Sequence, residues 1–359
     1  MNKKLLWILW HPTPYNTHLL NEASKSYEVV VIYIADILST HPWSASFEQH
    51  FKKLAWKKSD SKRKIISEVC SSSYRLRIVG GWNHPLMIFA LVSFAVLQRS
   101  FVIWTDTPRL LKKRGFTKRA FHWFLQFIIK RATAIFATGA IGASNFKRIY
   151  GQQLNVLNFP WTTDLNFYSP RISPVKEVPL AVLSIGRLLN VHKGFDVAVQ
   201  SIKDLKDQHR HSDFHYYIIG EGPDREKLTR MIAEFGLERQ ITIVGWLDPV
   251  EIIKHYKACS VFIHPSHVDP YPNAVLEAMA CGLPVISSNA AGSAVDRIIN
   301  GYNGLLFEDG RSDQLTDHLA ELLNSPEKRI ALGREARKTA ELWPVDFNLQ
   351  QLNDLLRDK

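Results

Sequence analysis

Two cationic side chains in the second half of the chain have the surroundings of an anion site. Arg187 and Lys193 occur in "SIGRLLNVHKGF", where an apolar run that predicts a strand ends at Gly186 and a helix follows. Arginine binds phosphate oxygens through two parallel hydrogen bonds, whereas lysine acts as a compact charge. A helix N-terminus adds unpaired N–H groups. We therefore expect this stretch to bind an anion, and a diphosphate is the natural guest.

A carboxylate in an apolar helical stretch points to the same ligand. Glu277 stands in "NAVLEAMAC", whose other residues are apolar except Asn273, one turn earlier. An ionised carboxylate away from water costs several kcal/mol, in rough terms, unless it is paired or hydrogen-bonded. A core arginine could satisfy it, and so could the two vicinal hydroxyls of a ribose. Beside a diphosphate site, we predict that ligand hydroxyls are the partners of Glu277.

Alternating strands and helices must position these residues. Apolar strand-like runs recur throughout the chain, separated by helix-length segments, which is typical of parallel sheets covered on both faces. Ligands bind such open sheets beyond the carboxyl ends of the strands. After a first strand within residues 1–10, strands are predicted at 27–35, 76–81, 100–106, 132–139, 180–186, 215–220, 240–246, 259–266, 284–288 and 304–308.

The alternation is interrupted once, which predicts two domains. Regular patterning stops in the proline-containing stretch 158–180. At 359 residues the chain is longer than one hydrophobic core usually serves. We therefore predict an α/β protein with two doubly wound, Rossmann-like domains facing across a cleft. The domains are expected at 1–165 and 179–345, with a linker at 166–178 and a final helix at 346–359 that crosses back to the first domain.

Charge is distributed unevenly over the chain. Residues 1–165 hold 23 Lys and Arg against 8 Asp and Glu, and residues 166–359 hold 22 against 26. The basic residues concentrate at 51–64 and 109–131, interleaved with Phe, Trp and Leu. This mixture is typical of segments at an anionic membrane surface, but it also fits a solvated basic face over a buried stripe. No helix-turn-helix or RNA-binding signature favours a nucleic-acid partner.

Several classes of protein do not fit the sequence. Three widely spaced cysteines without CxxC spacing argue against a disulfide framework and a zinc site. The longest uncharged apolar run, at 85–98, is shorter than the ~20 residues that span a bilayer, so a buried helix is expected there. The apolar run at the start is shorter than a signal-peptide core and is expected to form a strand.

Four blocks in the second half resemble one enzyme family. "SIGRL…KG", "IIGEGP", "VGWL" and "DPYPNAVLEAMACGLPVI" occur in that order and look like retaining family 4 glycosyltransferases of the GT-B fold. The last block is similar to that family's E-x7-E signature, with Asp269 in place of the first glutamate. The resemblance covers residues 158–310 well. The first half is similar only through "NFPWTTDLNFYSP" and "TGAIGASNFKRIYG".

The resemblance implies a role for each matching residue. Arg187 and Lys193 would hold the donor diphosphate, Glu277 the ribose, and Asp269 the transferred sugar. Asp269 could also cap the helix that follows it. Pro272 has no N–H to offer a ligand. The remaining donor-site residues are Gly186 and Gly220 in the loops, Trp246 and Leu247 near the base, and Tyr271, Asn273 and Ala274 through their backbone amides.

The first half carries weaker candidates. The family often has a histidine after a first-domain strand, and Asp106 stands at that position here. It could bind the donor sugar or the acceptor, or it could cap a helix, because Asp before Thr-Pro suits a helix start. The acceptor-side candidates are His11, Thr13, Tyr15 and Trp82.

The sequence therefore predicts a retaining glycosyltransferase that uses a nucleotide-diphosphate sugar, with no cofactor and no metal. The acceptor is expected to be a glycan or a lipid-linked glycan in surface polysaccharide assembly. The expected location is the cytoplasm, at the inner face of the membrane. Two alternatives stay open: a nucleotide-sugar epimerase or hydrolase on the same fold, and a membrane-surface binding module without catalysis.

Overall fold

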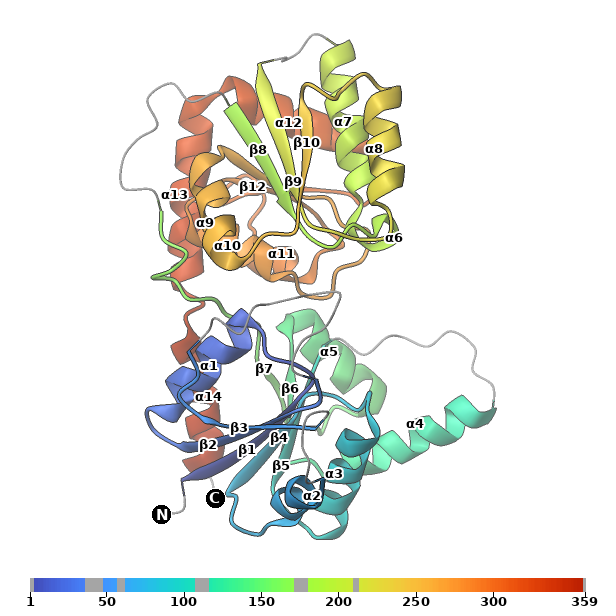
Figure 1. Cartoon of the computed structure of the whole chain (residues 1–359), viewed down its shortest axis with the longest axis vertical. Coiled ribbons are helices and arrows are strands. Elements are labelled where there is room, and N and C mark those ends of the chain that lie inside the picture. Colours follow the sequence, from blue (N-terminus) through green and yellow to red (C-terminus); the bar gives the residue numbers. More distant parts are fainter. Residues whose placement is uncertain are drawn as a thin grey trace. The chain divides into compact units, whose positions relative to one another are not determined.

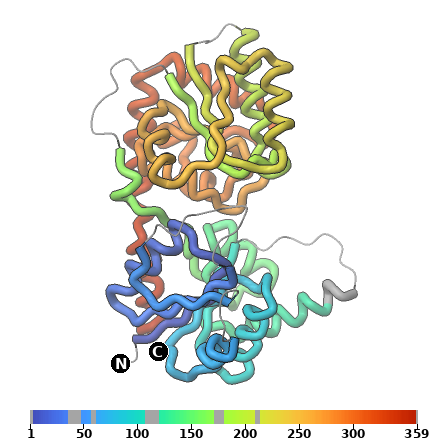
Figure 2. The backbone as a smooth tube through the Cα atoms, viewed as in Figure 1, coloured from blue at the N-terminus to red at the C-terminus, as the bar shows by residue number. Residues whose placement is uncertain are grey.

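The chain folds into two compact units. The computed structural model describes residues 3–35, 48–56, 62–106, 116–170, 180–208 and 213–357, with the backbone alone for 116–119. Unit 1 comprises Met1–Trp161 and Val345–Lys359, and unit 2 comprises Thr162–Pro344. In Figures 1 and 2 the colours follow the sequence, so unit 1 contains the first part of the chain in blue to green and the final helix in red.

Unit 1 is built on a parallel sheet in the order β3-β2-β1-β4-β5-β6-β7. The direction of strand addition reverses between β1 and β4, which makes their carboxyl ends a topological switch point. The strands are β1 (Lys4–Leu9), β2 (Glu28–Tyr33), β3 (Lys52–Ala55), β4 (Leu76–Val79), β5 (Phe101–Thr105), β6 (Ala134–Ala137) and β7 (Val156–Asn158).

Two strands of unit 1 were not predicted from the sequence. β3 has the sequence KKLA and no fully buried residue, and β7 has three residues. Both are edge strands, which are paired on one side only. An edge strand needs no continuous apolar run, so the hydrophobic pattern that predicts central strands is missing here.

Helices cover both faces of this sheet. α2 (Lys62–Cys70), α3 (Pro85–Val96), α4 (Phe116–Ile129) and α5 (Gly139–Tyr150) pack on one core cluster. α1 (Pro14–Ser24) and α14 (Val345–Arg357) pack together on the other face, so the two ends of the chain lie side by side in Figure 1. The amide of Asn348 in α14 donates to the Pro160 carbonyl over 2.8 Å.

Unit 2 contains a second parallel sheet, in the order β10-β9-β8-β11-β12-β13. All six strands lie at the predicted positions: β8 (Leu180–Ile185), β9 (Phe214–Ile219), β10 (Ile241–Gly245), β11 (Val261–His264), β12 (Val285–Ser288) and β13 (Leu305–Phe307). The two α/β units are Rossmann-like, as the sequence predicted.

The helices of unit 2 divide between the two faces of its sheet (Figure 1). One face carries α7 (Phe195–Asp207), α8 (Arg225–Glu234) and α12 (Ser312–Asn324). The other carries α9 (Pro249–Ala258), α10 (Asn273–Ala280), α11 (Gly292–Arg297) and α13 (Pro326–Glu341), and the single-turn helix α6 (Asn190–Lys193) lies at the end of β8. Within the described ranges, no helix combines the length and apolar character that crossing a bilayer requires.

The first part of the expected linker is fixed to unit 2. The Arg337 guanidinium donates through Nη1 to the carbonyl oxygens of Leu165, Tyr168 and Ala280, at 3.3, 3.1 and 2.7 Å. One cation thus holds residues 165–168 against the end of α10. The rest of the expected linker, residues 171–178, lies outside the described part of the chain.

The docking of α14 gives a stability prediction for unit 1. Leu352 is fully buried between α1 and the sheet, so Leu352→Ala should lower the free energy of unfolding by about 2–5 kcal/mol. Tryptophan fluorescence during urea unfolding is a suitable measurement, because eight of the ten tryptophans lie in residues 1–161. The exposed Gln350→Ala in the same helix is the control, and equal stability of the two variants would contradict this packing.

Candidate functional site

Three loops meet at the carboxyl edge of the sheet in unit 2. The Gly186 N–H donates to the Ile219 carbonyl at 3.0 Å, and the Gly220 N–H donates to the Gly245 carbonyl at 2.8 Å. Gly220 has a φ of +148°, and a Cβ atom there would lie 1.9 Å from the Gly186 carbonyl oxygen. Only glycine allows this close approach, so the two predicted glycines bring the ends of β8 and β9 together.

A second close approach places Lys193. Gly194 links α6 to α7 with a φ of +60°, and a Cβ atom there would lie 2.1 Å from the Pro265 carbonyl oxygen. The Val268 N–H also donates to the His192 carbonyl at 3.1 Å. The loop after β11 is therefore held directly against α6, and Lys193 faces it.

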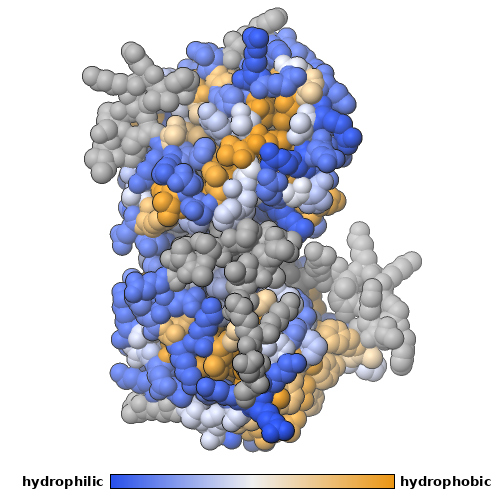
Figure 3. Space-filling view, viewed as in Figure 1, coloured by the Kyte–Doolittle hydropathy of each residue, from blue (hydrophilic) through white to orange (hydrophobic). Residues whose placement is uncertain are grey.

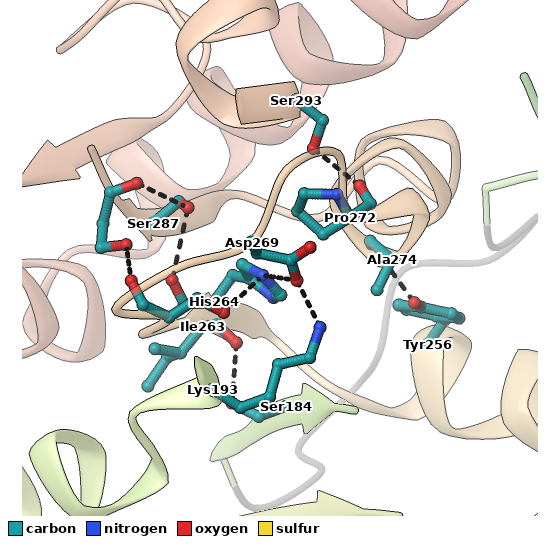
Figure 4. Close-up of polar contacts among 12 residues, drawn as sticks. Ser184, Lys193, Tyr256, Ile263, His264, Asp269, Pro272, Ala274, Ser287 and Ser293 are labelled. Carbon is teal, nitrogen blue, oxygen red and sulfur yellow. Dashed lines mark hydrogen bonds and ion pairs between the residues drawn. The ribbon is translucent and has the colours of Figure 1, made fainter. Parts of the chain in front are cut away.

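Lys193 forms a buried polar cluster with that loop (Figure 4). Its ammonium group donates to Asp269 Oδ2. His264 Nε2 lies 3.1 Å from the same oxygen and 2.8 Å from Ser266 Oγ. Since an ionised carboxylate only accepts hydrogen bonds, His264 Nε2 carries a proton and donates to Asp269. The structure thus unites Lys193 and Asp269, which are 76 residues apart.

Electrostatics keep Asp269 charged. Burial raises the pKa of a carboxyl group, but the nearby Lys193 ammonium and the hydrogen bond from His264 outweigh it and lower the pKa of Asp269 to about 2. Burial lowers the pKa of His264 despite its contact with Asp269. At neutral pH the cluster therefore contains an ammonium, a carboxylate and a neutral imidazole.

Glu277 is satisfied by protein hydroxyls. Tyr256 Oη donates to Glu277 Oε2 at 3.0 Å, and the Asn273 amide donates to Oε1 at 3.2 Å. The Tyr168 hydroxyl also hydrogen-bonds this carboxylate. These three donors are all neutral, so the described residues include no core arginine paired with Glu277, and its predicted contact with ligand hydroxyls stays a prediction. A carboxylate accepts about four hydrogen bonds, so acceptor capacity is left.

The environment of Glu277 favours its neutral form. Burial raises its pKa, and the hydrogen bonds from Tyr256, Tyr168 and Asn273 lower it by less, which leaves a pKa of about 7. Asn273 Oδ1 is buried and makes no hydrogen bond within the described ranges, so a second acceptor stands one helical turn from Glu277.

Comparison with known proteins agrees with this geometry. Residues 169–339, which include Lys193, Asp269 and Glu277, match the family model "Glycosyl transferases group 1". Those residues are a group 1 glycosyl transferase domain. The match does not extend over unit 1.

Relatives and solved structures extend the comparison. An uncharacterized glycosyltransferase of Methanocaldococcus jannaschii is 30% identical over 41% of this chain and 39% of its own length. The putative colanic acid biosynthesis glycosyltransferase WcaL of Escherichia coli is 29% identical over 53% and 47%. The chain thus spans about half the length of such relatives or less. The crystal structure of Anabaena HepE with UDP and glucose covers 99% of this chain and 100% of its own at 17% identity, with a TM-score of 0.78, which establishes the GT-B fold.

The other predicted donor-site residues of the glycosyl transferase domain lie in the same loops. The Arg187 side chain is exposed at the end of β8, and its guanidinium makes no hydrogen bond or ion pair with a described residue. The Ala274 carbonyl accepts from Tyr256 Oη at 3.2 Å. The Tyr271 ring packs 4.7 Å from the Arg297 guanidinium, which is in turn 4.8 Å from Trp343. Trp246 and Leu247 follow β10.

Most of the acceptor-side candidates contact neighbouring residues of unit 1. Thr13 is buried, and its hydroxyl caps α1 by accepting from the Asn16 N–H at 3.2 Å. The Tyr15 ring packs 4.8 Å from Trp161. Trp82 packs on the unit 1 core. The acceptor-side role of these three residues stays a prediction.

Two candidates stay at the carboxyl edge of the unit 1 sheet. His11 follows β1 and its Nδ1 lies 2.9 Å from the Pro12 carbonyl oxygen, while burial lowers its pKa. Asp106 is exposed at the end of β5. The helix start that Asp106 could cap lies at 107–115, outside the described residues, so both predicted roles of Asp106 stay predictions.

Four residues of the site were not predicted. His264 contacts Asp269, and Tyr168 and Tyr256 contact Glu277. Asn190 is buried, and neither polar atom of its amide makes a hydrogen bond within the described ranges. The position of Asn190 between Arg187 and Lys193 was a usable signal. The two tyrosines carried none, because they lie in different elements from Glu277.

No group of three or more His, Cys, Asp or Glu in the described part of the chain is arranged to hold a metal ion.

The pKa of Glu277 predicts a specific pH dependence. Its ordinary value of 4.5 is raised to about 7 in the folded state, so folding takes up a proton between these values and the free energy of unfolding falls as pH rises through that window. Glu277→Gln removes this loss. The stability of the variant relative to the natural protein should therefore grow by roughly 2–3 kcal/mol from pH 5 to pH 8, measured by urea unfolding followed by circular dichroism.

The exposed Glu234→Gln in α8 is the control and should show no such trend. A difference between Glu277→Gln and the natural protein that does not change with pH would contradict the burial of an ionisable Glu277.

The Lys193–Asp269 pair predicts a strong energetic coupling. Lys193→Met leaves a largely buried carboxylate without its cation and should cost roughly 3 kcal/mol of unfolding free energy. Lys193→Met combined with Asp269→Asn should cost less than Lys193→Met alone. The exposed pair Lys254–Glu251, at 2.6 Å, is the control, and Lys254→Met should cost less than about 1 kcal/mol. Strictly additive single substitutions would show that Lys193 and Asp269 do not interact.

Proposed function

We propose that this chain is a retaining, metal-independent glycosyltransferase that moves a sugar from a nucleotide-diphosphate sugar to a glycan or lipid-linked acceptor during surface polysaccharide assembly. The observation that carries the proposal is the meeting of Lys193 and Asp269 at the carboxyl edge of the sheet, beside the exposed Arg187. This edge is where open α/β sheets bind ligands. The surrounding segment matches the group 1 family model.

The cations would bind and activate the leaving group. Breaking the bond between the sugar C1 and the diphosphate oxygen leaves a negative charge on the departing phosphate. An exposed Arg187 can bind two phosphate oxygens at once. The Lys193 ammonium has three N–H donors, so its bond to Asp269 leaves others for phosphate. Fixed cations at the position where charge develops lower the barrier of the transfer step.

The acceptor would attack on the face that the phosphate leaves. The new bond joins the acceptor oxygen to C1, and the acceptor proton passes to an oxygen of the departing phosphate. This proton transfer gives retention without a protein nucleophile. Asp269 is held by Lys193 and His264, so a sugar hydroxyl would meet a carboxylate of fixed orientation.

The ribose would be bound at the start of α10. Glu277 has acceptor capacity left after its three protein donors, and the Asn273 amide oxygen is an unused acceptor. Two vicinal hydroxyls could donate to these two groups. HepE was crystallised with UDP and glucose, which makes UDP-sugars the first donors to test on this chain.

The acceptor assignment is supported by charge and by a relative. WcaL is named for the biosynthesis of colanic acid. Unit 1 holds most of the basic excess of the sequence, which suits an acceptor on an anionic membrane. We accordingly place the protein in the cytoplasm at the inner face of the membrane.

A donor panel tests the proposal. With membrane extract as acceptor source, one nucleotide sugar should release its nucleotide, and Arg187→Ala should slow this release about 10²–10³-fold. Arg230→Ala, an exposed arginine in α8, is the control and should be without effect. Nucleotide release should persist in excess EDTA. Loss of activity with EDTA would overturn metal independence.

Other outcomes identify the alternatives. Isomerisation of the sugar without nucleotide release would indicate an epimerase, and release that needs no acceptor would indicate a hydrolase. The absence of turnover and of nucleotide binding with every donor would leave a binding module.

A further inference from the structure

Two neighbouring helices of unit 1 expose large apolar side chains. On α4, Leu125, Ile128 and Ile129 are buried, whereas Trp123 and Phe127 on the opposite side are 69% and 46% exposed. An ordinary surface helix is polar on its outer face, but the outer face of α4 is aromatic. α3 adds further exposed residues next to it. We call the exposed apolar residues of these helices the α3–α4 face: Phe89, Val96, Leu97, Phe121, Trp123 and Phe127.

The face is a continuous feature of the surface. α3 and α4 pack against each other, and orange, hydrophobic residues gather over them at the lower right of Figure 3. Single exposed apolar residues need no explanation, but a cluster with several aromatic rings marks a surface that interacts with something.

Cations border this face, and acidic residues are absent from its helices. The sequences of α3, α4 and α5 contain no Asp or Glu. Between Glu68 and Asp164 the chain has 13 Lys and Arg and one acidic residue, Asp106. Lys130 and Arg131 follow α4 directly, and the Arg131 guanidinium lies 3.6 Å from the centre of the Phe127 ring.

α5 extends the basic border. The His122 ring of α4 stacks on Tyr150 of α5 at 5.1 Å, which places the two helices next to each other. The last turn of α5 carries Lys147 and Arg148. Aromatic rings and cations therefore share one side of unit 1, without carboxylates among them.

This combination selects one kind of partner. A second copy of this chain would bring two basic faces together, which like-charge repulsion opposes. An anionic bilayer offers negative headgroups to the cations and an interface in which Trp and Phe are stabilised. We propose that the α3–α4 face binds the surface of an anionic membrane, with Trp123 and Phe127 inserted at the headgroup level.

The other basic stretch, residues 51–64, fits this role less well. Lys52 donates to Glu68 at 2.8 Å, and the Lys62 ammonium lies over the Trp56 ring at 5.5 Å. These two lysines are thus engaged within the protein, and the described residues of this stretch expose no aromatic cluster. The inference stands independently of the transferase activity, because unit 2 carries the proposed donor site.

Flotation of the full chain with lipid vesicles tests the inference. Binding is expected to vesicles with 30% phosphatidylglycerol in phosphatidylcholine and to weaken strongly in 0.5 M salt, since salt screens surface charges. Trp123→Ser with Phe127→Ser should reduce the partition coefficient at least about tenfold. Lys130→Glu with Arg131→Glu should reduce it about 25-fold or more, at about fivefold for each cation lost.

Matched variants in unit 2 are the controls. Ile330→Ser, a 71% exposed apolar residue, and Lys227→Glu, an exposed lysine, should bind vesicles like the natural protein. Equal flotation of the α3–α4 variants and these controls would overturn the inference, and so would the absence of flotation in the natural protein. A dimer in light scattering that Trp123→Ser dissociates would assign the face to self-association instead. Far-UV circular dichroism of all variants verifies that they are folded. The donor panel tests the proposed function separately, so the two results can fail independently.

Discussion

The candidate site depends on one ion pair, between Lys193 after β8 and Asp269 after β11. Neither residue is near the other in sequence, and both lie in loops held by close backbone contacts at Gly194 and Gly220. A largely buried carboxylate is stable there only because Lys193 and His264 compensate its lost hydration. The pair therefore ties two loops together and also presents a charged oxygen and a charged nitrogen at the edge where a ligand would bind.

The burial of Glu277 is compensated differently from that of Asp269, although the two acidic residues are only eight positions apart in the sequence. Its donors are the hydroxyls of Tyr256 and Tyr168 and an amide, so burial is compensated only in part. The site thus combines a permanently charged carboxylate with one that titrates near neutral pH. Tyr168 belongs to the segment that Arg337 holds on unit 2, so the hydrogen bonding of Glu277 depends on residues outside the parallel sheet.

The two units differ in where their charged and aromatic side chains lie. Unit 2 concentrates buried charge within a few loops, whereas unit 1 carries its basic excess and its exposed aromatic rings on helices that cover one face of its sheet. The proposed transfer from a nucleotide sugar to a membrane-bound acceptor would use both kinds of surface. The membership of residues 169–339 in the group 1 glycosyl transferases accounts for the first surface, and the acid-free helices α3–α5 motivate the second.

The sequence alone determined the two-unit α/β fold, the six strands of unit 2 and the residue types of the donor site. It did so because central strands are continuous apolar runs, and because glycines and charges after such runs mark loop positions. Only the tertiary structure decided the hydrogen-bond partners: His264 for Asp269, Tyr168 and Tyr256 for Glu277, and the capping role of Thr13. These contacts join residues from different elements. The order of strands and loops in the sequence determines at which edge of the sheet a residue lies, but it does not determine which side chain that residue contacts there. The edge strands β3 and β7 were missed for a related reason, since pairing with a neighbour, rather than their own pattern, makes them strands.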